Sequence, residues 1–246
     1  MNTLPDRPLC DCRIVLVGTG GVGAPCAIAL AEAGVGELLL VDDDRVEIEN
    51  LHRQLLFDDG DVGASKPEAA RRSLERRRDT LRARAFEGRA LPAGARELIR
   101  GAHAVVDATD NFPSRFLLAD ACHLEKIPVV HAAAVRWTGT ALCAGPDGAP
   151  CYRCLFEDLP GPAPDCATAG IVGPVCGVIG GIAAEMALLA AQGRARLHGR
   201  VATFDGRTDE LRLVEVAVRP SCPLCGSKPV IFDLVETRYT GATCAA

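Results

Sequence analysis

A glycine-rich loop between a short apolar run and an alanine-rich stretch most constrains what this chain can fold into. Residues 13–17 (RIVLV) predict a buried strand, the loop GTGGVG occupies 18–23, and residues 24–33 predict a helix that ends before Gly34. A second apolar run, ELLLV, ends at Asp42. Strand, loop, helix and strand form a βαβ unit, in which the two strands lie parallel in one sheet.

The alternation of strands and helices continues along the chain. Further strands are predicted near 82–86, 102–109, 128–134, 201–204 and 211–218, and further helices after Lys66, over about 113–126 and within 170–191. We also expect a hairpin from about 137–142, with its partner strand after the Gly-Pro-Asp-Gly turn, and a loop at LPGPAPD. These elements predict an α/β fold with a Rossmann-like, doubly wound, mainly parallel sheet and a C-terminal antiparallel extension.

Charge and targeting patterns argue against some classes of partner. The formal net charge of -5 gives no general attraction to nucleic acid or to anionic membranes. The first residues, MNTLPDRPLC, lack the charged start and apolar core of a secretory signal, so we expect a cytoplasmic protein. Residues 170–191 are apolar over the length of a membrane helix but contain Pro174, Glu185 and five glycines. We expect a buried helix pair or an interface helix there, part of which could form a dimer contact.

The glycine loop has the sequence of a dinucleotide-binding loop. Gly18, Gly20 and Gly23 match G-x-G-x-x-G, and with Gly21 they let backbone N–H groups approach phosphates at the helix N-terminus. Asp42 lies 19 residues after Gly23, where its carboxylate can accept hydrogen bonds from ribose hydroxyls. On their own, these residues favour NAD and a dehydrogenase.

Two cations beyond the second strand change that interpretation. Arg53, in the stretch ENLHRQLLF, and Lys66 supply positive charge. Such charge suits the β- and γ-phosphates of ATP, whereas the helix N-terminus already serves the pyrophosphate of a dinucleotide. The alternative for Arg53 is a surface salt bridge.

Polar residues after a later strand predict a magnesium contact. The stretch VVDATDN places Asp107, Asp110 and Asn111 at the carboxyl edge of the sheet, where ligands bind in such folds. Mg²⁺ prefers carboxylate and phosphate oxygens, so Asp110 is a natural ligand for the metal that accompanies ATP. The alternative is that Asp110 caps the helix that begins near Pro113.

Seven blocks of this sequence resemble, in order and spacing, one family of enzymes. They are GTGGVG, VDDDRVEIENLHRQLLF, Lys66, DATDN, CYRC, DCATAG and CPLC, and they cover roughly residues 13–226. The family is that of the ThiF/MoeB/HesA adenylyltransferases, relatives of ubiquitin-activating enzymes. The resemblance implies a single ThiF-type adenylation domain over 1–246, with a nucleotide-binding half at about 13–135, a zinc, crossover-loop and C-terminal part at about 136–226, and a tail at 227–246.

The resemblance also implies ATP-dependent adenylation of the C-terminal glycine carboxylate of a ubiquitin-like sulfur-carrier protein. Pyrophosphate would leave, and the adenylate would lead to a thiocarboxylate for thiamine, molybdopterin or a related sulfur-containing product. The family positions that match Asp42, Asn50, Arg53, Lys66 and Asp110 hold ATP and its metal. Arg53, Lys66 and Mg²⁺ would stabilise the departing pyrophosphate, and no general base is needed because the carboxylate is already ionised.

Two Cys-x-x-Cys pairs predict a metal site. Cys151 and Cys154 are separated by 67 residues from Cys222 and Cys225, and four thiolates are a sufficient set for a closed tetrahedral zinc site. Because this set leaves no open coordination position, the zinc would be structural. A redox-active Cys-x-x-Cys pair is the alternative.

Cys166 differs from these cysteines because it stands in DCATAG, after a proline-rich loop and ahead of a predicted helix. A thiol near a helix N-terminus has a lowered pKa. The family's matching cysteine forms a covalent link to the carrier or its sulfur donor in some members and is dispensable in others, so both roles stay open. Cys244 is interpreted as an exposed thiol. We interpret the other single cysteines as buried apolar residues and the histidines as structural or surface residues: Cys10, Cys12, Cys26, Cys122, Cys143, Cys176, His52, His103, His123, His131 and His198.

The two ends of the chain depart from the family pattern. Members usually begin with a longer helical arm whose arginine enters the partner subunit's ATP site, and here only Arg7 and Arg13 lie near the start. The 21 residues after Cys225 are too few for a sulfurtransferase domain. The resemblance implies a homodimer, although an arginine from the partner subunit is not evident at the start of this chain. The missing sulfurtransferase domain predicts a separate sulfur donor, either a sulfurtransferase or a cysteine desulfurase.

Two other functions stay open at this point. An enzyme with the same fold and ATP chemistry could adenylate a different substrate, such as a peptide or a tRNA-bound group. The second alternative is a nicotinamide-dependent oxidoreductase or a non-catalytic binding module, against which Arg53, Lys66 and Asp110 argue.

Overall fold

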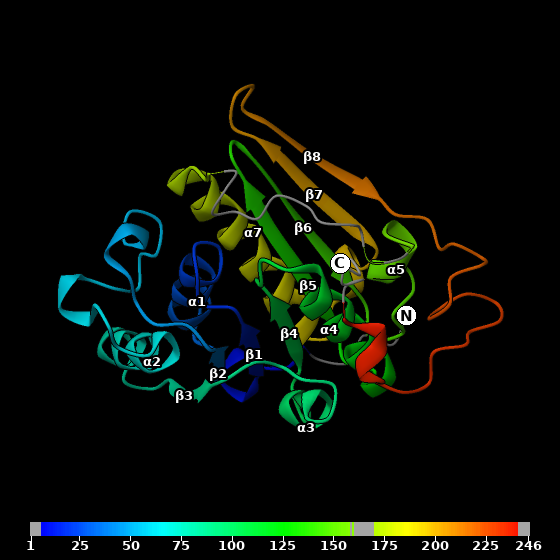
Figure 1. Ribbon diagram of the computed structural model, residues 1–246, viewed down its shortest axis with the longest axis horizontal. Helices are drawn as coiled ribbons and strands as arrows, with labels where there is room; N and C mark the ends of the chain where they lie inside the picture. The colour runs from blue at the N-terminus through cyan, green and yellow to red at the C-terminus, as the bar shows by residue number, and fades with distance from the viewer. Residues whose placement is uncertain (1–5, 158, 160–169, 241–246) are drawn as a thin grey trace, which may run out of the picture.

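A computed structural model describes residues 6–157, 159 and 170–240 of the chain. Its first part confirms the βαβ unit (Figure 1): β1 (Arg13–Val17), α1 (Gly23–Glu32) and β2 (Glu37–Asp42) follow one another, and β1 pairs with β2 in parallel. The central residues of β1 are buried on both faces, as expected for a parallel strand that helices cover on both sides.

The sheet has eight strands in the order β3-β2-β1-β4-β5-β6-β7-β8. From β3 to β5 neighbouring strands pair in parallel, and from β5 to β8 they pair antiparallel. The remaining strands are β3 (Arg82–Glu87), β4 (Ala104–Asp107), β5 (Val129–Val135), β6 (Thr138–Ala144), β7 (Arg200–Asp205) and β8 (Glu210–Glu215). The predicted mainly parallel sheet with an antiparallel extension is therefore confirmed.

Helices cover both faces of this sheet, which makes the fold doubly wound (Figure 1). One hydrophobic cluster joins α1, α2 (Lys66–Arg77) and α7 (Gly173–Ala191) to the face of β1 that carries Ile14 and Leu16. A second cluster joins α3 (Ala95–Ile99) and α4 (Phe112–Glu125) to the opposite face, which carries Val15 and Val17. The alternation of side chains along β1 thus supplies both cores.

Short helical segments connect these elements. Besides the four-residue helix α5 they are 3-10 helices, and several of them border the carboxyl edge of the sheet or the C-terminal segment. Their bounds are η1 (Leu9–Asp11), η2 (Ile48–Asn50), η3 (Asp59–Asp61), α5 (Tyr152–Leu155), η4 (Ala195–Leu197) and η5 (Glu236–Arg238).

Helix α7 is the long apolar helix that the sequence predicts within 170–191. By length and composition it could cross a membrane, but 56% of its most apolar stretch is buried inside the fold. It packs against α1 and against β5 and β6. Its apolar composition is therefore explained by its place in the core, as expected for a buried helix.

The predicted hairpin has a different partner. Strand β6 does not pair with a strand after the Gly-Pro-Asp-Gly turn, because that segment leads to α5. It pairs instead with β5, which precedes it, and the pair Val135–Thr138 closes a two-residue turn. Its other neighbour is β7, about sixty residues later in the chain.

Candidate functional site

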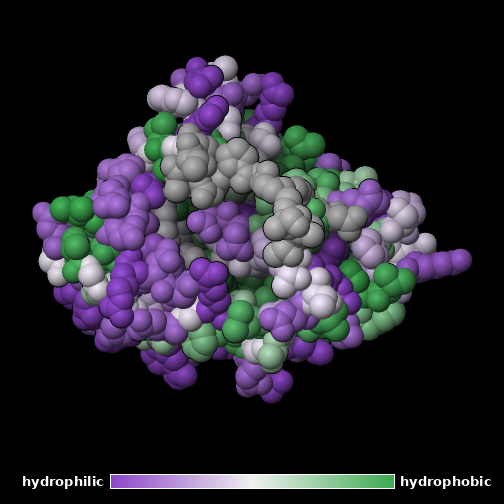
Figure 2. Space-filling model, viewed as in Figure 1, coloured by the Kyte–Doolittle hydropathy of each residue, from purple (hydrophilic) through white to green (hydrophobic). Residues whose placement is uncertain are grey.

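A cleft of about 1010 Å³ opens at the carboxyl edge of the parallel strands. Figure 2 shows a hollow near the centre of one face of the molecule, beside a largely hydrophilic surface. All but one of the residues predicted to bind the nucleotide line this cleft: Gly18, Gly20, Gly21, Asp42, Asn50, Arg53, Lys66, Asp110 and Asn111. The structure therefore brings together residues that are up to 93 positions apart in the chain.

The glycines of the loop differ in how much space a side chain would have at their positions. Gly18 has φ +89, and a Cβ there would lie 2.6 Å from the carbonyl oxygen of Ala108. A Cβ at Gly23, the predicted residue that does not line the cleft, would lie 1.9 Å from the carbonyl oxygen of Gly18. These two glycines let the loop close on itself and on the end of β4. Gly20 is open, since the nearest atom to its Cβ position is 3.7 Å away on Gln54.

Asp42 holds the glycine loop in place. Its Oδ2 accepts hydrogen bonds from the backbone N of Thr19 (2.7 Å) and from Thr19 Oγ1 (2.9 Å). Its Oδ1 accepts one from the backbone N of Asp44 (3.0 Å). A carboxylate has about four acceptor positions, so Asp42 retains capacity for a ribose hydroxyl while it fixes the loop.

Arg53 is positioned by a short chain of polar side chains that starts in η2. Glu47 Oε2 accepts a hydrogen bond from Asn50 Nδ2 (2.8 Å), and Asn50 Oδ1 accepts one from Arg53 Nη2. Within the described part of the chain, no carboxylate forms an ion pair with Arg53, which argues against the surface salt bridge. The guanidinium lies on the cleft wall with charge that no neighbouring carboxylate offsets at ion-pair distance.

Lys66 lies at the first turn of α2, and its side chain is 6% exposed. Its Nζ is 2.6 Å from Asp44 Oδ2, and Arg89 Nε is similarly 2.6 Å from Asp43 Oδ2. The stretch of three aspartates at the end of β2 thus holds two cations at the rim of the cleft. Carboxylate oxygens of Asp42, Asp43 and Asp44 lie within 4.8 Å of one another, a spacing that a metal ion could bridge.

The two roles considered for Asp110, helix capping and metal binding, fall to two different residues after β4. Asn111 is the N-cap of α4, because its Oδ1 accepts a hydrogen bond from the backbone N of Ser114 (2.9 Å). Asp110 is exposed on the cleft wall, and its Oδ1 is 3.5 Å from Asn111 Nδ2. Capping therefore belongs to Asn111 and leaves the Asp110 carboxylate facing the cleft.

A buried polar network that no sequence motif indicates lies below this edge. Asp107, at the end of β4, accepts hydrogen bonds from Thr109 Oγ1 (2.6 Å) and from His131 Nδ1 (2.7 Å), and Arg115 Nη1 lies 3.9 Å from its Oδ2. Burial raises the pKa of Asp107, but the Arg115 charge and the His131 hydrogen bond outweigh it and lower the pKa below its ordinary value. Asp107 and His131 are opposite each other in the β4–β5 register, a pairing that no single stretch of the sequence indicates.

Beyond this network the cleft continues along the antiparallel part of the sheet. There its wall is small or apolar, in contrast to the charged end near α2. The side chains on this wall come from β5, β6, β7 and α5 and include Ala133, Thr140, Leu142, Val201, Tyr152 and Phe156. We call this part the neutral arm of the cleft.

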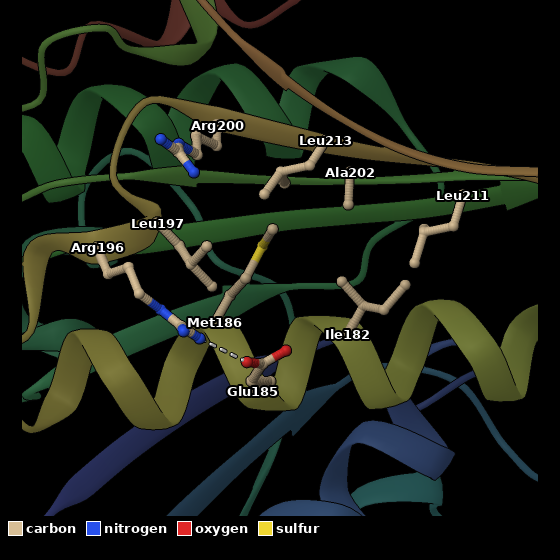
Figure 3. A pocket seen from close by; sticks show the side chains of 9 residues that line it. All are labelled: Ile182, Glu185, Met186, Arg196, Leu197, Arg200, Ala202, Leu211 and Leu213. Carbon is tan, nitrogen blue, oxygen red and sulfur yellow. Dashed lines mark hydrogen bonds and ion pairs between the residues drawn. The ribbon is translucent and has the colours of Figure 1, made fainter.

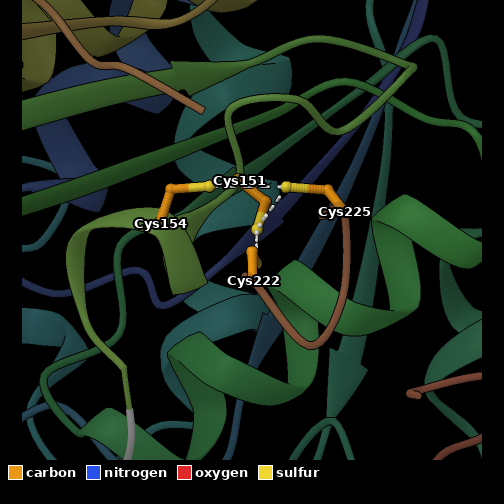
Figure 4. Close-up of side chains that lie close together, drawn as sticks. All are labelled: Cys151, Cys154, Cys222 and Cys225. Carbon is orange, nitrogen blue, oxygen red and sulfur yellow. Dashed lines mark hydrogen bonds between the residues drawn. The ribbon is translucent and has the colours of Figure 1, made fainter. Parts of the chain in front are cut away.

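The four predicted zinc ligands meet in space (Figure 4). Cys151 Sγ is 3.5 Å from Cys222 Sγ and 3.4 Å from Cys225 Sγ, and Cys154 Sγ is 3.4 Å from Cys225 Sγ. Four sulfurs around zinc at about 2.3 Å would be about 3.8 Å apart, so a small outward shift of the sulfurs accommodates the ion. The hydrogen bond between Cys225 and Cys151 lowers the pKa of Cys225 to about 5, whereas that bond and burial raise the pKa of Cys151.

The grouping of the four thiols therefore suits a bound metal ion. Without a cation, four thiolates this close would repel one another. The arrangement brings all four sulfurs together, whereas a redox-active pair needs only two, and this favours zinc.

A buried ion pair attaches this cysteine site to α4. Arg153, between the first two cysteines, donates to both oxygens of Asp120 at 2.7 and 2.8 Å. Tyr239 donates its hydroxyl proton to Asp120 Oδ2 (2.8 Å). The predicted tail, residues 227–246, is thus anchored to α4 through Tyr239 in its described part.

The remaining sequence predictions have mixed outcomes. Cys10 is exposed, so its interpretation as buried is wrong: it lies in η1 at the surface. Cys166 and Cys244 lie outside the described residues. Arg7 donates to the carbonyl of Ala191 (2.7 Å) and Arg13 pairs with Glu37 (3.1 Å), so both arginines contact their own chain. The other five single cysteines are buried, as expected: Cys12, Cys26, Cys122, Cys143 and Cys176.

A second, smaller cavity of about 270 Å³ lies between α7 and strands β7 and β8 (Figure 3). Ile182, Met186 and Leu213 point into it, and Glu185 pairs with Arg196 (3.0 Å) beside them. It shares no lining residue with the cleft and contains none of the residues predicted to bind nucleotide or metal. We therefore assign the candidate site to the large cleft.

Known proteins resemble this chain in sequence. The ThiF family matches residues 7–224. A SAMP-activating enzyme E1 of Haloferax volcanii is 44% identical over 241 residues, which cover 96% of this chain and 88% of that protein. A sulfur carrier protein adenylyltransferase of Thermus thermophilus is 38% identical over 231 residues, 91% of this chain and 85% of that protein. The chain also matches 55% of the adenylyltransferase and sulfurtransferase MOCS3 of Dictyostelium discoideum, at 35% identity, and so spans about half of that relative.

Solved structures resemble it in fold. E. coli MccB in complex with MccA-N7isoASN superposes with a TM-score of 0.79 at 22% identity, over 89% of this chain and 68% of that chain. E. coli MccB with ATP gives a TM-score of 0.76 at 22% identity, over 89% and 67%. Because the family match covers most of the chain, and two relatives are 44% and 38% identical to it over 88% and 85% of their own length, the chain belongs to the ThiF family and is an adenylyltransferase of the ThiF/MoeB type.

Proposed function

We propose that this enzyme uses ATP to adenylate the C-terminal glycine carboxylate of a ubiquitin-like sulfur-carrier protein. The observation that carries the proposal is the composition of the cleft. Cations gather at one end, over the glycine loop, and a neutral arm leads away from them along the antiparallel strands. A triphosphate fits the first part and a slender peptide tail fits the second. The names of the relatives from Haloferax volcanii and Thermus thermophilus support a carrier protein as the substrate.

In the proposed reaction a carboxylate oxygen of the carrier attacks the α-phosphorus of ATP. A new oxygen–phosphorus bond forms, the bond between the α-phosphorus and the bridging oxygen breaks, and pyrophosphate leaves with the electron pair. The loop around Gly20 binds the nucleotide phosphates, and Asp42 binds the ribose while it fixes that loop. No proton needs to be removed from the nucleophile, because a carboxylate is ionised at neutral pH.

Arg53 and Lys66 stabilise the charge that grows on the leaving group. Arg53 is held by Asn50 and keeps donors for phosphate oxygens, and Lys66 exchanges part of its contact with Asp44 for a phosphate. Because both cations are positioned before the nucleotide binds, little reorganisation is needed during the reaction. Asn111 supports this end by fixing the start of α4.

The Asp110 carboxylate is proposed to hold the Mg²⁺ that accompanies ATP. That ion would neutralise phosphate charge. Zinc is proposed for the four-cysteine site, where it would fix the C-terminal segment to the start of α5.

The further steps are proposed from the sequence alone. The adenylate would lead to a thiocarboxylate for thiamine, molybdopterin or a related product, with sulfur from a separate sulfurtransferase or cysteine desulfurase. Cys166 is a candidate for a covalent intermediate in that transfer. A homodimer in the cytoplasm is proposed as the working state, with no nucleic acid or membrane partner.

A peptide substrate is the second candidate function. The solved structures of MccB with MccA-N7isoASN and with ATP have the same fold as this chain, but at 22% identity they support the fold alone. An enzyme specific for nicotinamide dinucleotides is not favoured, because Arg53 faces the cleft without a carboxylate partner among the described residues.

Exchange of labelled pyrophosphate into ATP tests the proposal. The purified full chain is mixed with ATP, Mg²⁺ and small candidate carriers, each supplied with and without its C-terminal Gly-Gly. Exchange that depends on the Gly-Gly end is expected. Exchange only with a short peptide would support the second candidate, and tight NAD binding without any exchange would contradict both.

The same assay separates the two chemical steps. Cys166→Ala is expected to leave pyrophosphate exchange intact and to impair only the later transfer of sulfur to the carrier. Loss of exchange in that variant would contradict the role given to Cys166. Cys10→Ala, at an exposed cysteine in η1, is the matched control.

A further inference from the structure

His131 is a buried imidazole that lines the cleft, and one of its two nitrogens has no partner. Its residue exposure is 2%. Nδ1 lies 2.7 Å from Asp107 Oδ2, and Nε2 is buried without a hydrogen-bond partner in the part of the chain that the structure describes. Buried polar atoms in native proteins nearly always have a partner, so Nε2 points to a ligand group that binds beside it.

The Asp107 carboxylate determines which nitrogen carries the proton. An ionised carboxylate can only accept hydrogen bonds, and Asp107 is kept ionised by the Arg115 guanidinium 3.9 Å away. Nδ1 of His131 is therefore the donor. The Asp107–Arg115 pair is already neutral as a whole, so a neutral imidazole fits the site without adding a buried charge. In that tautomer Nε2 is an acceptor and requires a donor from the ligand.

Two other imidazoles in the described chain also have an unpartnered nitrogen. They are His123, on α4, and His198, after η4. Neither of them lines the cleft. Of the three, only His131 combines a buried free acceptor with a place in the site where substrate binds.

The position of His131 along the cleft identifies the part of the substrate that it meets. It lies opposite Asp107 in the β4–β5 register. Asp107 precedes Asp110 by three residues, and Asp110 lines the charged end of the cleft, where the phosphates are proposed to bind and which we call the phosphate end. Its ring also contacts Tyr152 of the neutral arm, with 4.6 Å between ring centroids. His131 therefore lies where the phosphate end passes into the neutral arm.

At this junction a carrier tail has few groups that could donate a hydrogen bond to Nε2 of His131. Its terminal carboxylate contains only acceptors and must approach the α-phosphorus. The nearest donor in the tail is the amide N–H of the terminal glycine, two bonds from the carboxylate carbon. We propose that Nε2 of His131 accepts a hydrogen bond from this N–H and so places the carboxylate in line with the phosphate. This inference rests on the proposed function and names a substrate-binding residue for it.

A carrier with an ester in place of its last amide tests the contact. Glycolate replaces the terminal glycine, which exchanges the N–H for an oxygen and adds no bulk. Pyrophosphate exchange is measured for the wild type and for His131→Leu with the amide and the ester carrier. Loss of one buried hydrogen bond is expected to raise the carrier KM about tenfold. This increase is expected for the wild type with the ester carrier, and for His131→Leu with either carrier. The KM for ATP should stay within about twofold.

The comparison of the four reactions decides the inference. If His131 accepts the bond, the ester costs the wild type about tenfold and costs His131→Leu less than about twofold. An equal penalty in both enzymes, or none in the wild type, would overturn the inference although exchange itself proceeds. Absence of exchange with any Gly-Gly carrier would overturn the proposed function first. His123→Leu, which changes an imidazole away from the cleft, is the matched control and should behave as the wild type does.

A spectroscopic measurement needs no variant. In the full chain labelled with ¹⁵N at histidine, His131 is expected to show a protonated Nδ1 and an unprotonated Nε2 near neutral pH. Addition of the amide carrier together with a non-hydrolysable ATP analogue should shift Nε2 of His131, and the ester carrier should not. A protonated Nε2 in the free enzyme would overturn the inference.

Discussion

The two ends of this molecule are stabilised in different ways. At the nucleotide end, charged side chains stand on elements whose apolar faces belong to the two large hydrophobic clusters on either side of the sheet. At the cysteine end, the local cluster contains only four buried residues: Cys151, Cys222, Leu224 and Ile231. The nucleotide end has a core of its own, and the cysteine end depends on attachments to α4 and on its four sulfurs.

Because of this difference, the ligand of the nucleotide end and the metal of the cysteine end should have different roles. Lys66 and Arg53 are already held by neighbours, so the nucleotide end can keep its shape before ATP arrives. The cysteine end buries too little apolar surface to offset the entropy of ordering its loops, and small modules of this kind obtain the missing free energy from a metal. Ligand removal should therefore change activity at one end and structure at the other.

Removal of the metal is expected to have the largest effect. Structural zinc sites bind with an apparent free energy of about 10 kcal/mol or more, and most of it acts as local folding energy. Cys222→Ser is predicted to abolish stoichiometric zinc and to make the segment around residues 219–231 sensitive to protease. Zinc content by atomic absorption and limited proteolysis measure the two effects, and ATP affinity by calorimetry should change little.

The control for this prediction is Cys10→Ser, at an exposed cysteine outside the cluster, which should retain zinc. Equal protease resistance in Cys222→Ser and the wild type would contradict the difference between the two ends. A lost ATP affinity in that variant would show instead that the two ends fold as one unit.

Loss of a phosphate-binding cation is expected to have the next largest effect. Arg53→Ala and Lys66→Ala should lower pyrophosphate exchange by about 10²- to 10³-fold, on the order of 3–4 kcal/mol of transition-state stabilisation. Their zinc content should resemble that of the wild type, because neither side chain supports the cysteine end. Arg71→Ala on α2, whose guanidinium pairs with Glu68 and Glu75 at the surface, is the matched control. Wild-type exchange rates in either cleft variant would contradict the proposed site.

The sequence predicts the regular part of the fold well because its signals are local. The strand, glycine loop and helix at 13–33 follow one another directly, and each has a periodicity of its own. The hairpin was wrong because its turn carries no turn residue: Arg136 adopts φ 53 between β5 and β6, a conformation that usually calls for Gly or Asn. The Gly-Pro-Asp-Gly turn is a stronger local signal but leads to α5.

The residues of the candidate site also differ in whether a local sequence signal predicts them. Residues with a motif of their own, such as Arg53 in ENLHRQLLF, can be assigned to the nucleotide site from the sequence. Asp107 and His131 could not, because their contact depends on the register of β4 against β5 and on Arg115 from α4. Side chains that act together through strand pairing leave no pattern along one stretch of sequence.

Removal of the Asp107 charge should have a smaller effect than the changes above. Its charge is hydrogen-bonded to His131 and Thr109, so Asp107→Asn is predicted to lower the free energy of unfolding by about 2–3 kcal/mol at pH 7. Because the folded pKa of Asp107 lies below its ordinary value of about 3.9, this stability is present above pH 4. It disappears as the pH falls through the folded pKa.

Urea denaturation of the two proteins across the pH range measures this difference. The gap between wild type and Asp107→Asn should stay constant from pH 7 to about 5 and narrow below about pH 4. A gap that is the same at every pH would show that the carboxylate charge of Asp107 contributes nothing. Asp59→Asn, at an exposed aspartate in η3, should leave the acid limb of the stability curve unchanged.

The smallest expected effect concerns the attachment of the tail to α4. Tyr239→Phe removes one hydrogen bond to Asp120 but leaves both bonds from Arg153, so the buried carboxylate stays paired and the cost should be about 1 kcal/mol. Tyr239→Leu, which also removes the ring from the hydrophobic cluster around α4, should cost more. Hydrogen exchange of the amides near η5 would measure both effects locally. If Tyr239→Phe instead released zinc, the cysteine end would depend on the tail as strongly as on its metal.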